Sequence, residues 1–321
     1  MKAWQFYCVG MLTWGLCVVA VAQTYPSKPV RFIVPFAPGG GNDLIARIIG
    51  QKLTERWGQP VVVDNRPGAG GNIAAETTAR SAPDGYTVFQ FNVANAIAVS
   101  LYKKLSYDPV KDFEAVTQLA SSPFILVTHS SVKVKTVQEL VALAKAQPGK
   151  LNYGSSGNGG SGHLTMELFK TMTGTHFVHI PYGGAGPALS DLVGGQVQLM
   201  FTVPATALVH VRSGRLHALG VSSLARIELA PNIPTISESG AAGFESTAWY
   251  GVVVPAHTPR AIVSRLNADI VAVLHQPEIE ARMTKQGVEL VGSTPAQFAE
   301  FIKTQIVKWG RVVRVSAARV D

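Results

Sequence analysis

Two glycine-rich turns carry the residues that could bind an anion. The first lies between an apolar run at 31–36 and a helical pattern at 44–49, and its candidate residues are Phe36, Gly39, Gly40, Gly41, Asn42 and Asp43. Glycines let the backbone approach a ligand, and the first N–H groups of a helix have no intrahelical acceptor. This arrangement attracts anions. Similar turns also occur in α/β proteins that bind nothing there, so both interpretations stay open for this turn alone.

A second turn of the same kind lies in the other half of the chain. It follows a strand-like run at 151–154 and precedes a helical pattern at 164–169, and its candidate residues are Ser155, Ser156, Gly157, Asn158 and His163. His163 stands where that helix begins, and a ligand contact and a structural role are both open for it. His176 and His179 alternate along a predicted strand, which favours structural roles for them.

The motifs of catalytic and nucleotide-binding sites do not fit this sequence. Segment 157–162 matches the dinucleotide pattern G-x-G-x-x-G, but the following strand ends at Ile180-Pro181 without the acidic residue that holds a ribose. No serine lies in a G-x-S-x-G elbow, and the eight histidines show no metal-binding spacing. We therefore expect no catalytic residue, no metal and no cofactor, but polar loops that bind a ligand.

The elements that must position these turns alternate along the chain. Strands are expected at 31–36, 61–63, 86–91, 123–128, 177–180, 197–201, 217–221 and 249–255, with helices between them and two long helices near the C-terminus. This alternation predicts an α/β fold with parallel strands and right-handed crossovers. Ligands of such sheets lie at the carboxyl ends of the strands, which adds the predicted loop 92–95 with Asn92 and Asn95 to the candidates.

Composition and the amino-terminal segment describe an exported protein. The length of 321 residues suggests two domains, and 47% hydrophobic with 15% charged residues fits packed α/β layers. Residues 1–22 have a basic start, an apolar run and the ending Ala20-Val21-Ala22, which predicts a signal peptide cleaved after Ala22. Both cysteines lie in it, so the mature chain would form no disulfide. The net charge of +8 is scattered, which argues against nucleic-acid binding.

Short segments throughout the mature chain match one protein family. They include Ile33–Gly40, Val63–Asn72, Pro83–Tyr86, Pro148–Tyr153, Ser155–Gly157, His163-Leu164, His179–Tyr182 and Trp249–Gly251. On these segments the chain closely resembles the Bug family, the periplasmic solute-binding components of tripartite tricarboxylate transporters. The resemblance implies a type II periplasmic binding-protein fold with two doubly wound α/β lobes and a hinge of two segments. We place the first lobe at 23–123 plus 249–321 and the second at 124–248.

The resemblance also implies how a ligand would be held. In the family, the loop matching Phe36–Asp43 holds a ligand carboxylate with backbone amides and ordered water, and the loop matching Ser155–His163 grips the ligand from the other lobe. This chain departs from the family where Phe201-Thr202 replaces the usual Phe-Asp and Tyr182-Gly183-Gly184 replaces a frequent Tyr-Lys-Gly. Tyr182, Gly183 and Thr202 therefore join the candidates.

Thr202 cannot pair with a ligand amine as an aspartate can, so we expect a ligand without positive charge: a di- or tricarboxylate, or an aromatic carboxylate. The resulting hypothesis is a periplasmic receptor whose lobes close over a small organic carboxylate and whose closed form is recognised by membrane transporter subunits. Two alternatives stay open. One is a sensor that presents its ligand to a signalling partner. The other is an exported enzyme that uses the same cleft, and it would require a reactive group among Ser155, Ser156 and His163.

Overall fold

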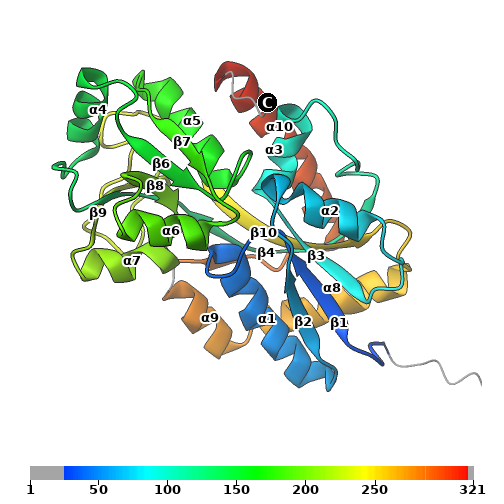
Figure 1. The fold of residues 1–321 in the computed structure, drawn as a ribbon. Coiled ribbons are helices and arrows are strands. Elements are labelled where there is room, and N and C mark those ends of the chain that lie inside the picture. The colour runs from blue at the N-terminus through cyan, green and yellow to red at the C-terminus, as the bar shows by residue number, and fades with distance from the viewer. Residues whose placement is uncertain (1–24, 286, 317–321) are drawn as a thin grey trace, which may run out of the picture.

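The computed structural model describes residues 25–285 and 287–316, and the predicted signal peptide at 1–22 lies outside them. The chain forms two α/β lobes that lie side by side (Figure 1). The first lobe contains a six-stranded sheet in the order β11-β4-β10-β3-β1-β2. Its strands are β1 (Val30–Val34), β2 (Val61–Asn65), β3 (Thr87–Asn92), β4 (Phe113–Pro123), β10 (Thr247–Pro255) and β11 (Glu289–Leu290).

The second lobe contains a five-stranded sheet in the order β7-β6-β8-β5-β9. Its strands are β5 (Ile125–His129), β6 (Asn152–Ser155), β7 (Val178–Pro181), β8 (Leu199–Thr202) and β9 (Leu216–Val221). The parallel pairing predicted for the first three strands is confirmed, since β1 pairs in parallel with β2 and with β3. Both sheets are nevertheless mixed, because β10 runs antiparallel to its neighbours β3 and β4, and β5 runs antiparallel to β8 and β9.

Helices cover the faces of both sheets (Figure 1). The first lobe carries α1 (Gly41–Trp57), α2 (Asn72–Ala79), α3 (Val93–Leu101), α8 (Arg260–Leu274), α9 (Pro277–Thr284) and α10 (Pro295–Ser316). The second carries α4 (Val137–Ala146), α5 (Ser161–Thr173), α6 (Ala185–Val193) and α7 (Pro204–Arg212). Within the described residues, none of these helices combines the length and the apolar character that crossing a membrane requires.

The first turn sits where β1 meets α1, and its surroundings explain why the helix starts there. Ile45, Ile48, Ile49 and Leu53 recur at helical spacing and are buried against the sheet. Gly40 is the N-cap, and Gly58 ends the helix in the left-handed conformation at φ 64°. The N-terminus of α1 therefore points at the edge of the sheet where β1 ends, as the sequence pattern predicts.

Two chain segments connect the lobes near the middle of the molecule. Strand β4 runs into β5 with only Phe124 between them, and β10 carries the chain back into the first sheet. One apolar cluster continues through both lobes and includes Phe201 and Tyr250. The lobe limits of 23–123 plus 249–321 and 124–248 stay a prediction. They place the two crossings between the lobes in these two connecting segments.

The predicted loop at 92–95 is wrong, because α3 begins at Val93. Asn92 is the N-cap: its side chain accepts a hydrogen bond from the Ala94 amide at 2.9 Å, and the Asn95 side chain accepts one from the Asn92 amide at 3.1 Å. This capping box uses the side-chain oxygens that the sequence analysis offered to a ligand. The pattern Asn-x-x-Asn is a weaker capping signal than Ser-x-x-Glu, which is why it was missed.

Candidate ligand-binding site

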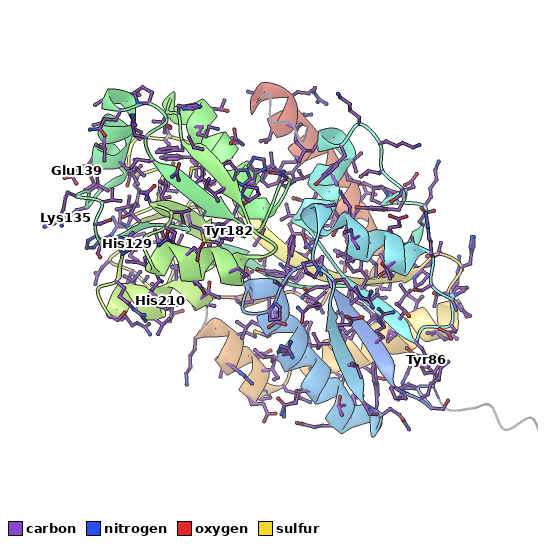
Figure 2. All side chains as sticks on the ribbon, in the orientation of Figure 1. Tyr86, His129, Lys135, Glu139, Tyr182 and His210 are labelled. Carbon is purple, nitrogen blue, oxygen red and sulfur yellow. The ribbon has the colours of Figure 1, made fainter. Side chains whose placement is uncertain are left out.

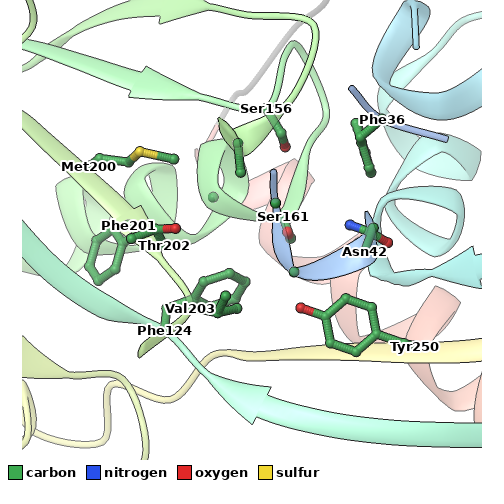
Figure 3. Close-up of a pocket in the computed structure, with 14 residues that line it drawn as sticks. Phe36, Asn42, Phe124, Ser156, Ser161, Met200, Phe201, Thr202, Val203 and Tyr250 are labelled. Carbon is green, nitrogen blue, oxygen red and sulfur yellow. The ribbon is translucent and has the colours of Figure 1, made fainter. Parts of the chain in front are cut away.

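A small cavity lies between the lobes, close to the two connecting segments (Figure 3). Its volume is about 30 Å³. The lining residues are Phe36, Gly40, Gly41, Asn42, Phe124, Ser156, Ser161, Gly162, Ala185, Met200, Phe201, Thr202, Val203 and Tyr250. A single water needs roughly 10–15 Å³ of such space, so this cavity would hold very few atoms. A larger ligand can enter only when the lobes move apart.

Four helix N-termini converge on this cavity. Gly41 begins α1, Ser161 begins α5 and Ala185 begins α6, while Val203 is the N-cap of α7. None of the four N-cap residues places a side-chain hydrogen bond on its helix. The first N–H groups of α1, α5 and α6 therefore have no side-chain cap, whereas α7 begins with Pro204, which has no N–H, and its Thr206 amide donates to the Val203 carbonyl at 3.2 Å. Each of the four helices places a positive partial charge at this end. All lining side chains are uncharged, so the positive electrostatic potential that attracts an anion to the cavity comes from the backbone.

Polar side chains add a few directed contacts. Figure 3 shows Asn42, Ser161 and Tyr250 pointing towards the space between the lobes. The Asn42 Oδ1 atom is buried and has no hydrogen-bond partner, while its backbone carbonyl accepts a bond from Gln90 Nε2 at 3.0 Å. The Thr202 and Thr206 hydroxyls are 3.1 Å apart. The hydroxyl groups and the Asn42 side-chain NH₂ can donate hydrogen bonds to a ligand oxygen. The Asn42 Oδ1 atom can accept a hydrogen bond from a ligand hydroxyl group.

The structure places six of the predicted site residues in the cavity lining: Phe36, Gly40, Gly41, Asn42, Ser156 and Thr202. Gly41 is required there by close approach, because a Cβ atom on it would lie 2.6 Å from Tyr250 Oη and 3.1 Å from Val203 Cγ2. The tyrosine hydroxyl can approach the start of α1 only because residue 41 has no side chain.

Asp43 and Gly39 serve the loop and do not line the cavity. The Asp43 carboxylate accepts hydrogen bonds from the Gly39 amide at 3.1 Å, from Arg47 Nε at 2.9 Å and from Asn65 Nδ2 at 3.1 Å. Burial would raise the pKa of Asp43, but these bonds outweigh burial and hold its pKa below the usual value. Its charge is thus paired with Arg47 on the same helix.

Ser155 lies behind the cavity, beneath the second turn. Its hydroxyl is 2.6 Å from His179 Nε2 and also bonds to the backbone of Gly157 at 3.1 Å. A serine–histidine contact can mark an activated nucleophile. Here the serine is fully buried and absent from the lining, so the pair braces the turn.

Stacked rings support the same turn. The His163 and His179 rings are 4.1 Å apart and nearly parallel, and Tyr153 stacks on His179 at 4.8 Å. His163 Nδ1 accepts a hydrogen bond from the Gly159 amide at 3.0 Å, which requires that nitrogen to be unprotonated. Glu167 lies 3.7 Å from His163 Nε2, but Lys170 at 2.7 Å balances its charge. His163 is therefore structural in this arrangement.

We expect the protein to lose stability as the pH falls from about 7 towards 4. Burial, with a smaller contribution from Lys170, lowers the pKa of His163 to about 4, and burial together with His163 lowers that of His179 to about 3. An unfolded histidine binds its proton near pH 6.5. Between these values the unfolded chain takes up protons that the folded chain does not, so each histidine lowers the unfolding free energy by about 1.4 kcal/mol per pH unit.

Thermal unfolding at pH values between 7 and 4.5 measures this effect. The His163→Gln variant should show a shallower decline of Tm than the unmodified protein. His217→Gln, at a half-buried position on β9, is the matched control for exchanging one histidine for glutamine. Equal slopes for all three proteins would contradict the expectation.

Four of the remaining predicted residues line a neighbouring hollow of about 290 Å³. Gly157, Asn158, Tyr182 and Gly183 lie there with Tyr102, and Ser156 borders both this hollow and the cavity. Figure 2 labels Tyr182 near the middle of the molecule, beside α6, and its hydroxyl donates a 2.8 Å hydrogen bond to Asp191 of that helix. Asn92 and Asn95, used in the α3 capping box, appear in neither lining.

Sequence reasoning missed several lining residues, above all Phe124, Ser161 and Tyr250. Phe124 and Tyr250 come from the connecting segments, whose apolar patterns read only as buried strands. Ser161 has a local signal, since it follows the glycines of the second turn at the first position of α5. Within the described residues, no group of three or more histidine, cysteine, aspartate or glutamate side chains could hold a metal ion.

Comparisons with known proteins find close relatives of this chain. Residues 45–317 match the family model described as tripartite tricarboxylate transporter family receptor. Protein BugT of Bordetella pertussis is 37% identical over 310 residues, which cover 96% of this chain and 95% of BugT.

Two similar solved structures have ligands. R. palustris Rpa4515 with adipate is 34% identical, with a TM-score of 0.89, and the match covers 92% of this chain and all of that one. MatC (Rpa3494) from Rhodopseudomonas palustris with bound malate is 32% identical, with a TM-score of 0.87, and the match covers 90% of this chain and all of that one. The predicted family and the two-lobed periplasmic binding-protein fold are confirmed. The chain therefore belongs to the family of tripartite tricarboxylate transporter receptors, which are periplasmic solute-binding proteins and not enzymes.

Proposed function

We propose that this receptor captures a small organic dicarboxylate between its lobes and delivers it to the membrane subunits of a tripartite transporter. The observation that carries the proposal is the convergence of four helix N-termini on a cavity without charged side chains. Such termini stabilise anions by partial charge and by free N–H groups. The relatives solved with adipate and malate support the same class of ligand.

The helix ends come from both lobes, which favours a ligand with two separated negative groups. Gly40, Gly41 and Asn42 face the cavity from the first lobe, while Ser161 and Ala185 face it from the second. One carboxylate would take the amides of α1 and the other those of α5 and α6. Because each lobe holds one end, the ligand favours the closed arrangement, and closure is the state that a membrane partner can distinguish.

The absence of a carboxylate in the lining bears on ligands with an amine. By the family resemblance, Thr202 occupies a position at which aspartate is usual, and none of the fourteen lining residues is charged. An ammonium group buried in this cavity would meet no negative partner and would lie among four positive helix ends. We therefore propose a ligand without positive charge. The receptor would bind it in the periplasm, after its own export and the removal of residues 1–22.

Native mass spectrometry of freshly purified protein, followed by ligand identification after denaturation, tests the proposal directly. Titration calorimetry with adipate, malate, aspartate and glutamate complements it. We expect an unmodified dicarboxylate to co-purify or to bind, and the two amino acids to bind more weakly. Tighter binding of aspartate or glutamate than of any amine-free carboxylate would overturn the ligand class, and a chemically altered ligand would favour an enzyme.

Tyr250 provides a smaller test of the same site. Its ring is buried on β10, and its hydroxyl faces the start of α1 at the cavity. We expect Tyr250→Phe to weaken dicarboxylate binding by about 10-fold, because one hydrogen bond to a charged group is lost while the ring remains. Tyr153→Phe, which removes a hydroxyl bonded to Glu167 outside the lining, is the matched control. Calorimetry on both variants measures the difference, and equal affinities would exclude the hydroxyl as a ligand contact.

A further inference from the structure

The lobes touch through backbone at the N-terminus of α6. The Ala37 amide of the first lobe donates a 3.1 Å hydrogen bond to the Gly183 carbonyl of the second. A Cβ atom on Gly184 would lie 2.8 Å from the Ala37 nitrogen and 3.0 Å from the Ala37 Cβ. A Cβ atom on Gly186 would overlap the Pro38 carbonyl oxygen. We call the contact of Gly184 and Gly186 with residues 37–39 the glycine seam.

Space, and not backbone conformation, requires glycine at residue 184. Its φ of 173° is extended backbone that any residue adopts. It is also the N-cap of α6, where serine and threonine are among the favoured residues and would stabilise the helix. Glycine makes no side-chain cap, so the helix gains nothing from it. The atoms that a side chain would meet all belong to the other lobe, which makes the close approach the reason for glycine.

The seam also sets the position of the cavity wall. Ala185 lies between the two seam glycines and is itself a lining residue. The distance between the lobes at residues 184 and 186 therefore determines how close the start of α6 lies to the cavity. A second hydrogen bond between the lobes lies at the neighbouring hollow, where the Tyr102 side-chain hydroxyl of the first lobe donates to the Asn158 backbone carbonyl at 3.2 Å. The closed arrangement thus depends on contacts that do not involve the ligand.

We propose that Gly184 and Gly186 are positioning residues for ligand capture: their missing side chains let the second lobe close on residues 37–39 and bring α6 to the ligand. The inference rests on the proposed function, since capture is the process that closure serves. Enlarging residue 184 leaves each lobe intact and lowers the population of the closed state. Because apparent affinity falls with the fraction of molecules able to close, binding weakens although the lining residues are unchanged.

Gly184→Ser and Gly184→Thr test this directly, because they improve the α6 cap while obstructing closure. Gly194→Ser is the matched control: it makes the same change at the other end of α6, where the nearest atom to a Cβ is 3.5 Å away and the backbone is right-handed. We expect the Kd for adipate or malate to rise by about 10-fold for serine and further for threonine, with an unchanged or higher Tm. The control should bind as the unmodified protein does.

Lobe distance provides a readout that does not depend on the ligand. Both native cysteines fall within 1–22, so Glu55→Cys on α1 and Lys145→Cys on α4, both at exposed positions, accept spin labels selectively. The unmodified protein should populate the distance of the closed structure, in a larger fraction of molecules when adipate or malate is bound, and Gly184→Thr should not populate it. The proposed role of the glycine seam would be contradicted if Gly184→Thr showed the distance of the closed structure, or if the unmodified protein did not show it. Failure of adipate and malate to bind the unmodified protein counts against the proposed ligand class instead.

Discussion

Replacing Gly40 with valine is expected to abolish dicarboxylate binding and to leave the fold intact. Gly40 lines the cavity as the N-cap of α1, and a Cβ atom on it would lie 3.2 Å from the Ala185 Cβ and 3.7 Å from the Ala185 and Gly186 nitrogens. The two further methyl groups of valine would fill the space between α1 and α6. We expect a loss of at least about 100-fold, because one ligand carboxylate would lose amides of α1 and the other would lose amides of α6.

The fold should survive because the new side chain meets only the other lobe. Gly40 has φ −95° and ψ 176°, which valine adopts readily. Calorimetry measures the affinity, and circular dichroism with Tm checks the fold. Gly40→Ala gives a graded comparison, since its single methyl group needs a shift of only a few tenths of an ångström at Ala185. If Gly40→Val bound a dicarboxylate within a few-fold of the unmodified protein, the carboxylate clamp would lie elsewhere.

Local pattern was sufficient to find the first turn and the start of α1. A strand, a run of glycines and a helical repeat lie consecutively in the sequence, so no knowledge of distant contacts was needed. The same pattern cannot tell which way a polar side chain points. Asn42 faces the cavity, whereas the next residue, Asp43, turns to Arg47 and Asn65. One step along a helix turns the side chain by about 100°, and the contacts of Asp43 lie 4 and 22 residues away.

The floor of the cavity could not be predicted because it is formed by tertiary structure. Phe124 and Tyr250 are far apart in the sequence and meet only because β4 and β10 are neighbours in one sheet. The glycine seam has the same origin. Gly184 looks like an ordinary turn residue until Ala37, from the other lobe, is placed 2.8 Å from its absent side chain. Asn92 and Asn95 show the opposite failure, since a local capping interaction used side chains that appeared free for a ligand.

Replacing Thr202 with aspartate should reverse the charge preference of the site. Thr202 is buried at the end of β8, lines the cavity and bonds only to Thr206 through its hydroxyl. Two negative charges about 5 Å apart at an effective dielectric constant of about 20 repel by about 3 kcal/mol, which weakens dicarboxylate binding by about 100-fold. The same charge would pair with an ammonium group, so aspartate or glutamate should bind better than they do to the unmodified protein.

Thr202→Asn separates charge from shape, because asparagine matches aspartate in size and carries no charge. We expect this variant to bind dicarboxylates far better than Thr202→Asp at pH 7. Burial would raise the pKa of the introduced carboxyl, so the two variants should converge as the pH falls and the aspartate takes up a proton. Calorimetry at two pH values distinguishes the cases. Equal weakening of dicarboxylate binding by asparagine and aspartate would mean that Thr202 acts through its shape. The preference against amines would then have another cause, and the converging helix N-termini are the remaining source of positive potential.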